Sequence, residues 1–276
     1  MAAARGGGWR IDRVPVERLP QIEMMPVLAL RNPMYAYLEI DVSSARQRLR
    51  VHLQHTGERL SFTAFVIACV ARAVDEHRQV QAFRRGRRLL IFDQVDVATM
   101  VEVDADGTRV PLLYVIRDAA AMSVAEIHAE IRAVQEDPAP LLQQKQGQIE
   151  RLRRVPRPLR WLLWRALLRT PRLRRRFGGT VMVTTVGTFG VGRGWGHGLA
   201  CYPVTVTIGA ITPAPHIHAH ELDNREQLCL TVGLDHEVVD GGPATRFLGF
   251  LQALLEEGEG LDPVLSDPSP GLTALP

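Results

Sequence analysis

One segment near the carboxyl end constrains this chain more than any other: residues 230 to 248, LTVGLDHEVVDGGPATRFL. Apolar residues alternate before its histidine, as on one face of a strand, and recur at helical spacing after it. The alternating residues are Leu228, Leu230, Val232 and Leu234, and the helically spaced ones are Phe247, Leu248, Leu251, Leu254 and Leu255. A strand therefore leads through a short turn into a helix. His236 lies in that turn, four residues before Asp240 and its neighbour Gly241.

His236 in this turn carries a ring that can accept a proton during a reaction. Imidazole titrates near neutrality, so a neutral His236 can take a proton from a thiol or a hydroxyl while that group attacks. Asp240 is expected to accept backbone N–H groups at the helix start or to hold a cation, and Gly241 to permit the tight exit. A short H-x-x-x-D-G pattern also recurs by chance, and an ordinary core or surface histidine is the alternative interpretation.

The segment resembles the active-site segment of the dihydrolipoamide acyltransferases of 2-oxoacid dehydrogenase complexes, which belong to the chloramphenicol acetyltransferase-like superfamily. The resemblance covers most of residues 35 to 256 and includes GGTVMVTTVGTFGVG, CYPVTVTIGAI, LSFTAFVIACVARAVDEH and YAYLEIDVSSA. It implies an α/β fold of the chloramphenicol acetyltransferase type, an α+β two-layer sandwich whose mixed sheet is flanked by helices. The chain departs from the family at Glu237, where the family usually has Arg.

The resemblance also implies a mechanism and its residues. It implies direct, metal-free acyl transfer from a coenzyme A thioester, with His236 as the base. By register, Thr184 is expected to donate a hydrogen bond to the oxyanion, with Thr185 as the alternative if the register slips by one. Strand propensity alone also explains a threonine there. The family site lies between subunits, so a homotrimer or a multiple of trimers is expected, and Asp240 is expected to pair with an arginine that the sequence does not identify.

Several acceptors remain open. No stretch resembles a lipoyl or peripheral-subunit-binding domain, so we expect a stand-alone catalytic domain without the high effective concentration that tethering provides. That favours transfer of an acyl group, in the simplest case acetyl, to a small-molecule hydroxyl, as in natural-product biosynthesis. Dihydrolipoamide on a lipoyl domain supplied by another chain is the first alternative. An inactive trimeric scaffold is the second, and the intact His236, Asp240 and Thr184 argue against it.

Two further patterns have features of ligand sites. The stretch GTFGVGRGWGHG, residues 187 to 198, lacks a nucleotide-binding pattern. Its resemblance to a family loop near the active-site channel predicts that Gly187 and Trp195 line the substrate or coenzyme A site, unless they are ordinary exposed loop residues. Residues His216, His218 and His220 alternate, as metal ligands on a strand can. Prolines nearby and the lack of an evident acidic or cysteine partner argue against this, and we predict no metal.

Residues 145 to 176 form the most unusual segment, because eleven Arg and one Lys face a single acid, Glu150, among Trp and Leu residues. A basic amphipathic helix of this kind can lie on an anionic membrane surface, bind an acidic carrier protein or contact coenzyme A phosphates. Alternatively, it packs its Trp and Leu face on the trimer. We expect no nucleic-acid partner, because no recognised motif is present and the net charge is only +3.

Length and composition predict one compact enzyme domain, since 276 residues that are 46% hydrophobic can bury a sizeable core. We divide the chain into an N-terminal arm (1–34), a catalytic domain (35–260) with a basic helical insertion at about 140–177, and a disordered tail (261–276). The absence of a long apolar run and of a secretory signal predicts a cytoplasmic protein. Strands are expected at 35–42, 95–103, 109–116, 180–186, 203–211 and 227–235, and helices at 61–77, after the Ser123 and Glu126 capping box, and at 243–256.

Overall fold

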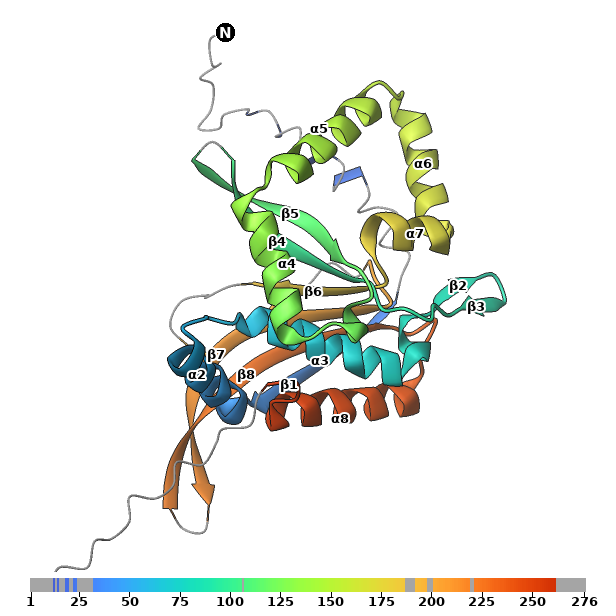
Figure 1. The fold of residues 1–276 in the computed structure, drawn as a ribbon. Helices are drawn as coiled ribbons and strands as arrows, with labels where there is room; N and C mark the ends of the chain where they lie inside the picture. The colour runs from blue at the N-terminus through green and yellow to red at the C-terminus, as the bar shows by residue number, and fades with distance from the viewer. Residues whose placement is uncertain are drawn as a thin grey trace, which may run out of the picture.

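The computed structural model describes residues 12, 14, 18–19, 22–23, 32–105, 107–186, 192–197, 201–218 and 221–261. Its centre is a six-stranded mixed sheet in the order β1-β8-β7-β6-β4-β5, with helices packed on one face (Figure 1). The strands of this sheet are β1 (Pro33–Asp41), β4 (Val97–Ala105), β5 (Thr108–Ile116), β6 (Val181–Thr185), β7 (Val204–His218) and β8 (Glu221–Asp235). Strands β2 (Phe83–Arg85) and β3 (Arg88–Leu90) form a separate hairpin.

Four helices cover the sheet. They are α2 (Ser43–Thr56), α3 (Phe62–Glu76), α4 (Val124–Glu136) and α8 (Gly241–Glu257). Helix α3 is central because its sequence, FTAFVIACVARAVDE, is apolar almost all round, so it is buried between the sheet, α4 and α8. Its core residues include Phe65 and Ile67, both with no exposed surface. Ser61 caps its start by accepting the backbone N–H of Ala64.

The predicted capping box is confirmed at the start of α4. The Ser123 hydroxyl accepts the backbone N–H of Glu126 at 3.2 Å, and the Glu126 carboxylate accepts the backbone N–H of Ser123 at 2.7 Å. Val124 and Ile127 are the buried residues of this helix, as its spacing predicts.

The β7–β8 hairpin is longer than the sequence predicts. Its strands pair antiparallel as far as His218 and Glu221, beyond a register shift between Ile208 and Ile211. Pro213 and Pro215 lie in this outer part of β7. They are tolerated because β6 pairs with β7 only as far as Ile208, so the outer part of β7 has β8 as its described neighbour and a proline nitrogen can face the free edge.

The basic segment is folded as three helices, α5 (Ala139–Arg153), α6 (Arg157–Arg169) and α7 (Pro171–Gly178). Each has a proline in its first two positions, where the missing N–H costs nothing. Helices α5 and α6 stand away from the sheet, beyond β5, and α7 returns the chain to β6 (Figure 1). Within the described residues, no helix is long and apolar enough to cross a membrane.

Candidate active site

His236 follows the last residue of β8, in a turn that is pinned from two sides. The backbone N–H of Asp235 donates to the Pro203 carbonyl at 2.9 Å, and that of His236 donates to the Asn32 carbonyl at 3.2 Å. The Asp235 carboxylate accepts the backbone N–H of Glu237 at 3.1 Å. Val238 and the residue after it are buried and lock the turn to the core. The imidazole itself is outside, with 53% of the side chain exposed.

Asp240 and Gly241 differ in part from their predicted roles. Asp240 precedes α8 with an extended backbone, but its side chain makes no capping hydrogen bond. Its Oδ1 lies 3.7 Å from Nδ1 of His236, and 88% of the side chain is exposed. The described contact of this carboxylate is therefore the histidine, rather than the arginine we expected. A Cβ on Gly241 would meet no atom within 4 Å, so packing within the described chain does not require glycine there.

Thr184 lies near the other end of the sheet. It is half-buried in β6 on the face opposite the core residues Val181 and Val183, and it pairs with Thr207 of β7. Thr207 in turn pairs with Thr231 of β8, five residues before the histidine. At about 3.3 Å per residue and about 4.8 Å between strands, Thr184 lies roughly 15 to 20 Å from His236. One chain therefore does not bring the two side chains to a common substrate.

Trp195 belongs to the Thr184 end of the sheet. Its indole Nε1 donates to the Leu38 carbonyl at 3.4 Å, and Leu38 pairs with Leu230, next to the threonine row. The segment 192–197 is held there by a 3.0 Å hydrogen bond from the Ala210 N–H to the Gly194 carbonyl. Thr185 ends β6 with an exposed side chain, and Gly187 lies outside the described residues.

The predicted site residues thus form two groups. His236, Asp240 and Gly241 lie in the turn at the end of β8, and Thr184, Thr185 and Trp195 lie toward the end of β6. Two cavities of the described structure, of about 560 and 470 Å³, include neither His236 nor Thr184. A single chain therefore does not place the two groups around either of these cavities.

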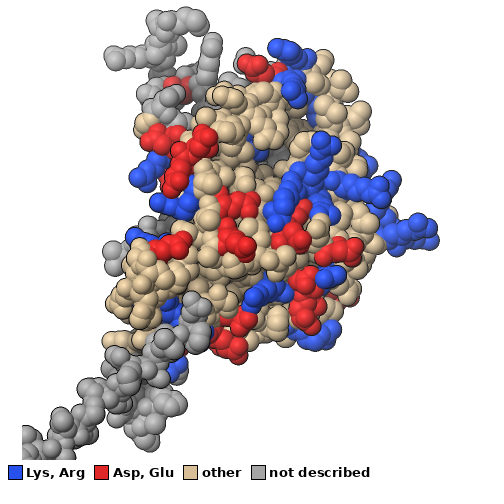
Figure 2. Space-filling view, viewed as in Figure 1, with Lys and Arg blue, Asp and Glu red and all other residues tan. Residues whose placement is uncertain are grey.

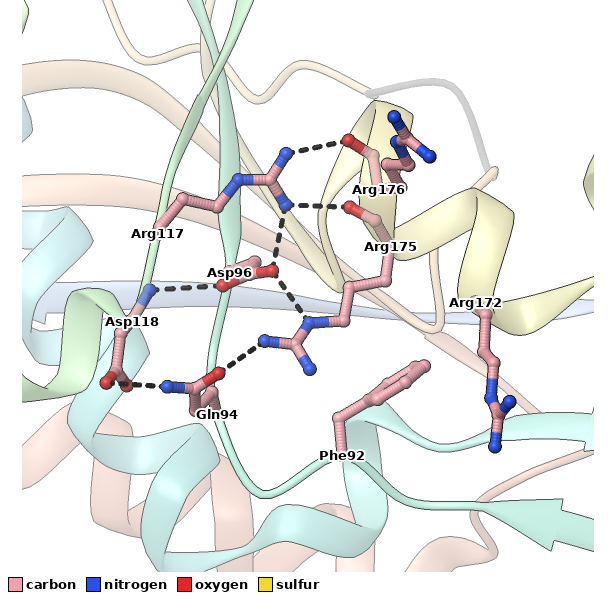
Figure 3. Close-up of a pocket in the computed structure, with 8 residues that line it drawn as sticks. All are labelled: Phe92, Gln94, Asp96, Arg117, Asp118, Arg172, Arg175 and Arg176. Atoms are coloured by element: carbon pink, nitrogen blue, oxygen red, sulfur yellow. Dashed lines mark hydrogen bonds and ion pairs between the residues drawn. The ribbon is translucent and has the colours of Figure 1, made fainter.

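The larger cavity lies where α7 joins the sheet, and sequence analysis missed it (Figure 3). Its centre is Asp96, whose side chain is 2% exposed and whose Oδ2 is 2.9 Å from Arg117 and 2.8 Å from Arg175. Burial opposes ionisation of Asp96, but hydrogen bonds from Arg175, the Asp118 N–H and Arg117 outweigh it and hold its pKa below the ordinary value. The signal available in the sequence was an acid inside the apolar strand VDVATM.

The Asp96 cluster has a structural use. Arg117 also donates to the carbonyls of Arg175 and Arg176 at 2.9 and 2.7 Å, both in the last turn of α7. The Arg175 carbonyl also accepts the N–H of Gly179, the residue that caps this helix. The cluster therefore anchors α7 to the strands. Among the described residues, no group of three His, Cys, Asp or Glu is placed to hold a metal ion, and the side chains of His216, His218 and His220 lie outside the described set.

Comparison with protein families decides the class of this chain. The model of the family described as 2-oxoacid dehydrogenases acyltransferase (catalytic domain) matches residues 32–139 and 166–261. The chain belongs to this family. It is an acyltransferase, as the strand, histidine turn and helix predict. The family match leaves out residues 140–165, which hold α5 and most of α6.

Solved structures show that the fold of this acyltransferase is the predicted one. A probable dihydrolipoamide acetyltransferase from Listeria monocytogenes is 19% identical, with 91% of this chain and 95% of that chain covered and a TM-score of 0.67. The dihydrolipoamide acetyltransferase of Azotobacter vinelandii is 17% identical, with coverage of 90% and 92% and a TM-score of 0.64. A truncated catalytic core of the 2-oxoacid dehydrogenase multienzyme complex from Thermoplasma acidophilum is 18% identical, with coverage of 90% and 98% and a TM-score of 0.62. No curated protein matches significantly by sequence.

Proposed function

We propose that this acyltransferase moves an acyl group from a coenzyme A thioester to an acceptor that His236 deprotonates. The observation that carries the proposal is an exposed imidazole on a turn pinned by the backbone of Asn32 and Pro203. The neutral ring takes the acceptor's proton while the acceptor attacks the thioester carbonyl. The tetrahedral intermediate then collapses, the carbon–sulfur bond breaks, and the ring returns the proton to the leaving thiolate. These steps need no metal.

The second element of the proposal is that two copies of the chain complete each site. Thr184 would donate its hydroxyl hydrogen bond to the oxyanion that forms beside His236 of a neighbouring copy, and a preorganised donor of this kind lowers the barrier by about 2.7 to 4 kcal/mol. Support comes from the roughly 15 to 20 Å that strand geometry puts between these residues in one chain. Three copies arranged around an axis would give three such sites, and we propose a homotrimer.

Two acceptors fit this chemistry. We propose a small-molecule hydroxyl first, because a neutral imidazole of this kind activates hydroxyl groups. The thiol of dihydrolipoamide on a separate lipoyl domain is the second candidate. It is favoured by the similar solved structures, two of which are described as dihydrolipoamide acetyltransferases.

Release of coenzyme A from acetyl coenzyme A tests the proposal. The purified chain is assayed with dihydrolipoamide and with a panel of small alcohols, and ester or thioester products are identified by mass spectrometry. His236→Ala is expected to lower the rate by about 10² to 10⁴. His55→Ala, which changes an exposed histidine of α2, is the matched control and is expected to leave the rate unchanged.

The outcomes separate the candidates. Ester formation that depends on His236 supports the hydroxyl acceptor, whereas rapid transfer to dihydrolipoamide with no ester supports the second candidate. Release that His236→Ala does not slow contradicts the proposed base. No release with any acceptor makes the chain an inactive scaffold.

A further inference from the structure

Helix α6 turns an apolar ridge toward solvent. Leu159, Leu162 and Leu163 are 49%, 55% and 46% exposed. Their spacing of three and four residues places them on one side of the helix. The neighbouring Trp161 is 48% exposed. A helix on the surface of a globular domain normally does the opposite and faces its apolar stripe inward.

Specific contacts hold the helix in this orientation. Arg160 and Trp164, on the other side of α6, both contact Glu23 of the N-terminal arm. The guanidinium of Arg160 is 2.7 Å from one Glu23 oxygen, and the indole Nε1 of Trp164 donates to the other at 3.4 Å. The Arg160–Glu23 pair is largely buried, with 18% and 16% of the side chains exposed. The polar side of α6 therefore faces the protein and the leucines face outward.

Positive charge surrounds the ridge. Residues 145 to 176 carry eleven Arg and one Lys against one acid. The guanidinium of Arg165 lies 4.7 Å from the Trp161 ring centroid. Arg154, Arg169 and Arg172 are exposed and have no acidic partner in the part of the chain that the structure describes. Figure 2 shows Lys and Arg side chains gathered over this upper part of the molecule and over the β2–β3 hairpin.

This ridge is separate from the two groups of predicted site residues. The family match omits residues 140–165, so most of α6 lies outside the elements that the family model describes. The main contacts of α6 in the described part of the chain are with α7 and with Glu23. A partner can therefore occupy the ridge without entering the site.

We propose that α6 binds the surface of an anionic lipid bilayer. A bilayer boundary complements both properties of the ridge, because leucine side chains enter the acyl region while arginines contact lipid phosphates. The exposed Trp161 adds a residue type that favours the boundary between the apolar and aqueous layers. Each α6 inserts only a few side chains, so each attachment is weak and reversible. Several copies in one oligomer strengthen it through avidity.

Flotation with lipid vesicles tests the proposal on the full chain. One set of vesicles is phosphatidylcholine alone, and the other contains phosphatidylcholine with phosphatidylglycerol. We expect binding to the anionic set, weakened by salt. Leu162→Glu is expected to reduce the affinity at least about tenfold, since it removes a buried leucine and adds repulsion. Arg169→Gln is expected to reduce it about fivefold.

Matched controls use the same substitutions elsewhere on the surface. Leu53→Glu changes a leucine of α2 that is 39% exposed, and Arg109→Gln changes an arginine whose side chain is 79% exposed. Both are expected to bind vesicles as the unmodified chain does. Light scattering without lipid gives the oligomeric state of every variant.

Two results would overturn the proposal. The first is no binding of the unmodified chain to anionic vesicles; if Leu162→Glu then also dissociates the oligomer, the ridge is a contact between copies. The second is binding that Leu162→Glu leaves unchanged, which would place the contact elsewhere. Neither of these results depends on acyl transfer, so the proposed chemistry is tested independently.

Discussion

Glu237 forms an ion pair with Arg84 of the β2–β3 hairpin, with 3.1 Å between its Oε2 and Nε of the arginine. Glu237 stands directly after the proposed base. Its partner lies within the same chain. The negative charge beside the histidine is therefore paired with an arginine on β2, and this pair ties the histidine turn to that hairpin.

We predict that this pair contributes little to stability and is not part of the chemistry. Half of the Arg84 side chain and a third of the Glu237 side chain are exposed, so Glu237→Gln is expected to lower the free energy of unfolding by about 1 kcal/mol or less. The acyl-transfer rate is expected to change less than tenfold. Urea denaturation and coenzyme A release measure the two effects. A rate loss as large as that of His236→Ala would show that Glu237 acts in catalysis.

The Asp96 cluster predicts a much larger effect from one conservative change. Asp96→Asn leaves Arg117 and Arg175 without their carboxylate, and we expect the free energy of unfolding at neutral pH to fall by about 3 kcal/mol. Asp93→Asn is the matched control, because that side chain is 99% exposed. Equal stability of the two variants in urea denaturation would contradict the anchoring role of Asp96.

The same cluster predicts how stability responds to acid. The folded-state pKa of Asp96 is lowered, so the folded chain binds fewer protons than the unfolded chain as the carboxylate titrates. Its stabilisation is complete above the unfolded pKa of about 3.9 and is lost as the pH falls through the folded pKa. The stability difference between the unmodified chain and Asp96→Asn should therefore stay constant above about pH 5 and shrink below about pH 4. If this stability difference stayed constant down to the pH at which the chain unfolds in acid, the lowered pKa of Asp96 would be contradicted.

Replacement of glycine by alanine is predicted to have opposite effects on stability at two positions. Gly179 ends α7 at a φ of +75°, and a Cβ there would lie 2.6 Å from the Asp96 carbonyl oxygen. Gly179→Ala is therefore expected to destabilise the chain by about 2 to 4 kcal/mol. Gly147 lies within α5 with nothing within 4 Å of an added Cβ, and Gly147→Ala is expected to stabilise it by about 0.5 to 1 kcal/mol. Thermal unfolding of both variants measures whether each substitution raises or lowers the stability. A lower stability of Gly147→Ala would contradict the open surroundings of this glycine.

The sequence pattern predicted those elements whose structure depends on interactions between residues close together in the chain. The α4 start is predicted because the hydrogen bonds of Ser123 and Glu126 are made within four residues. The strand, turn and helix around His236 are predicted because both hydrophobic periods are strong there. Helix α2 was missed, since its sequence, SSARQRLRVHLQHT, is mostly polar and Ala45 is its one buried residue.

Features that depend on contacts between residues far apart in the sequence could not be predicted from the sequence. The register that sets Thr184 opposite Thr207 is fixed by pairing among three strands, and it decides that Thr184 and His236 lie far apart. Arg160 and Glu23 are 137 residues apart in the sequence, and their contact determines which side of α6 faces out. Charge identified residues 145 to 176 as unusual but contained no information on the orientation of α6.

Activity of a mixed oligomer tests the shared site most directly. His236→Ala and Thr184→Val chains are co-expressed with different affinity tags, and the complexes that carry both tags are purified. If each site takes its base from one copy and its oxyanion donor from the next, every trimer that carries both tags regains about one site in three, although each variant alone is nearly inactive. Recovery of roughly that fraction of coenzyme A release is the predicted result. Mixed oligomers no more active than the separate variants would contradict a site built from two copies.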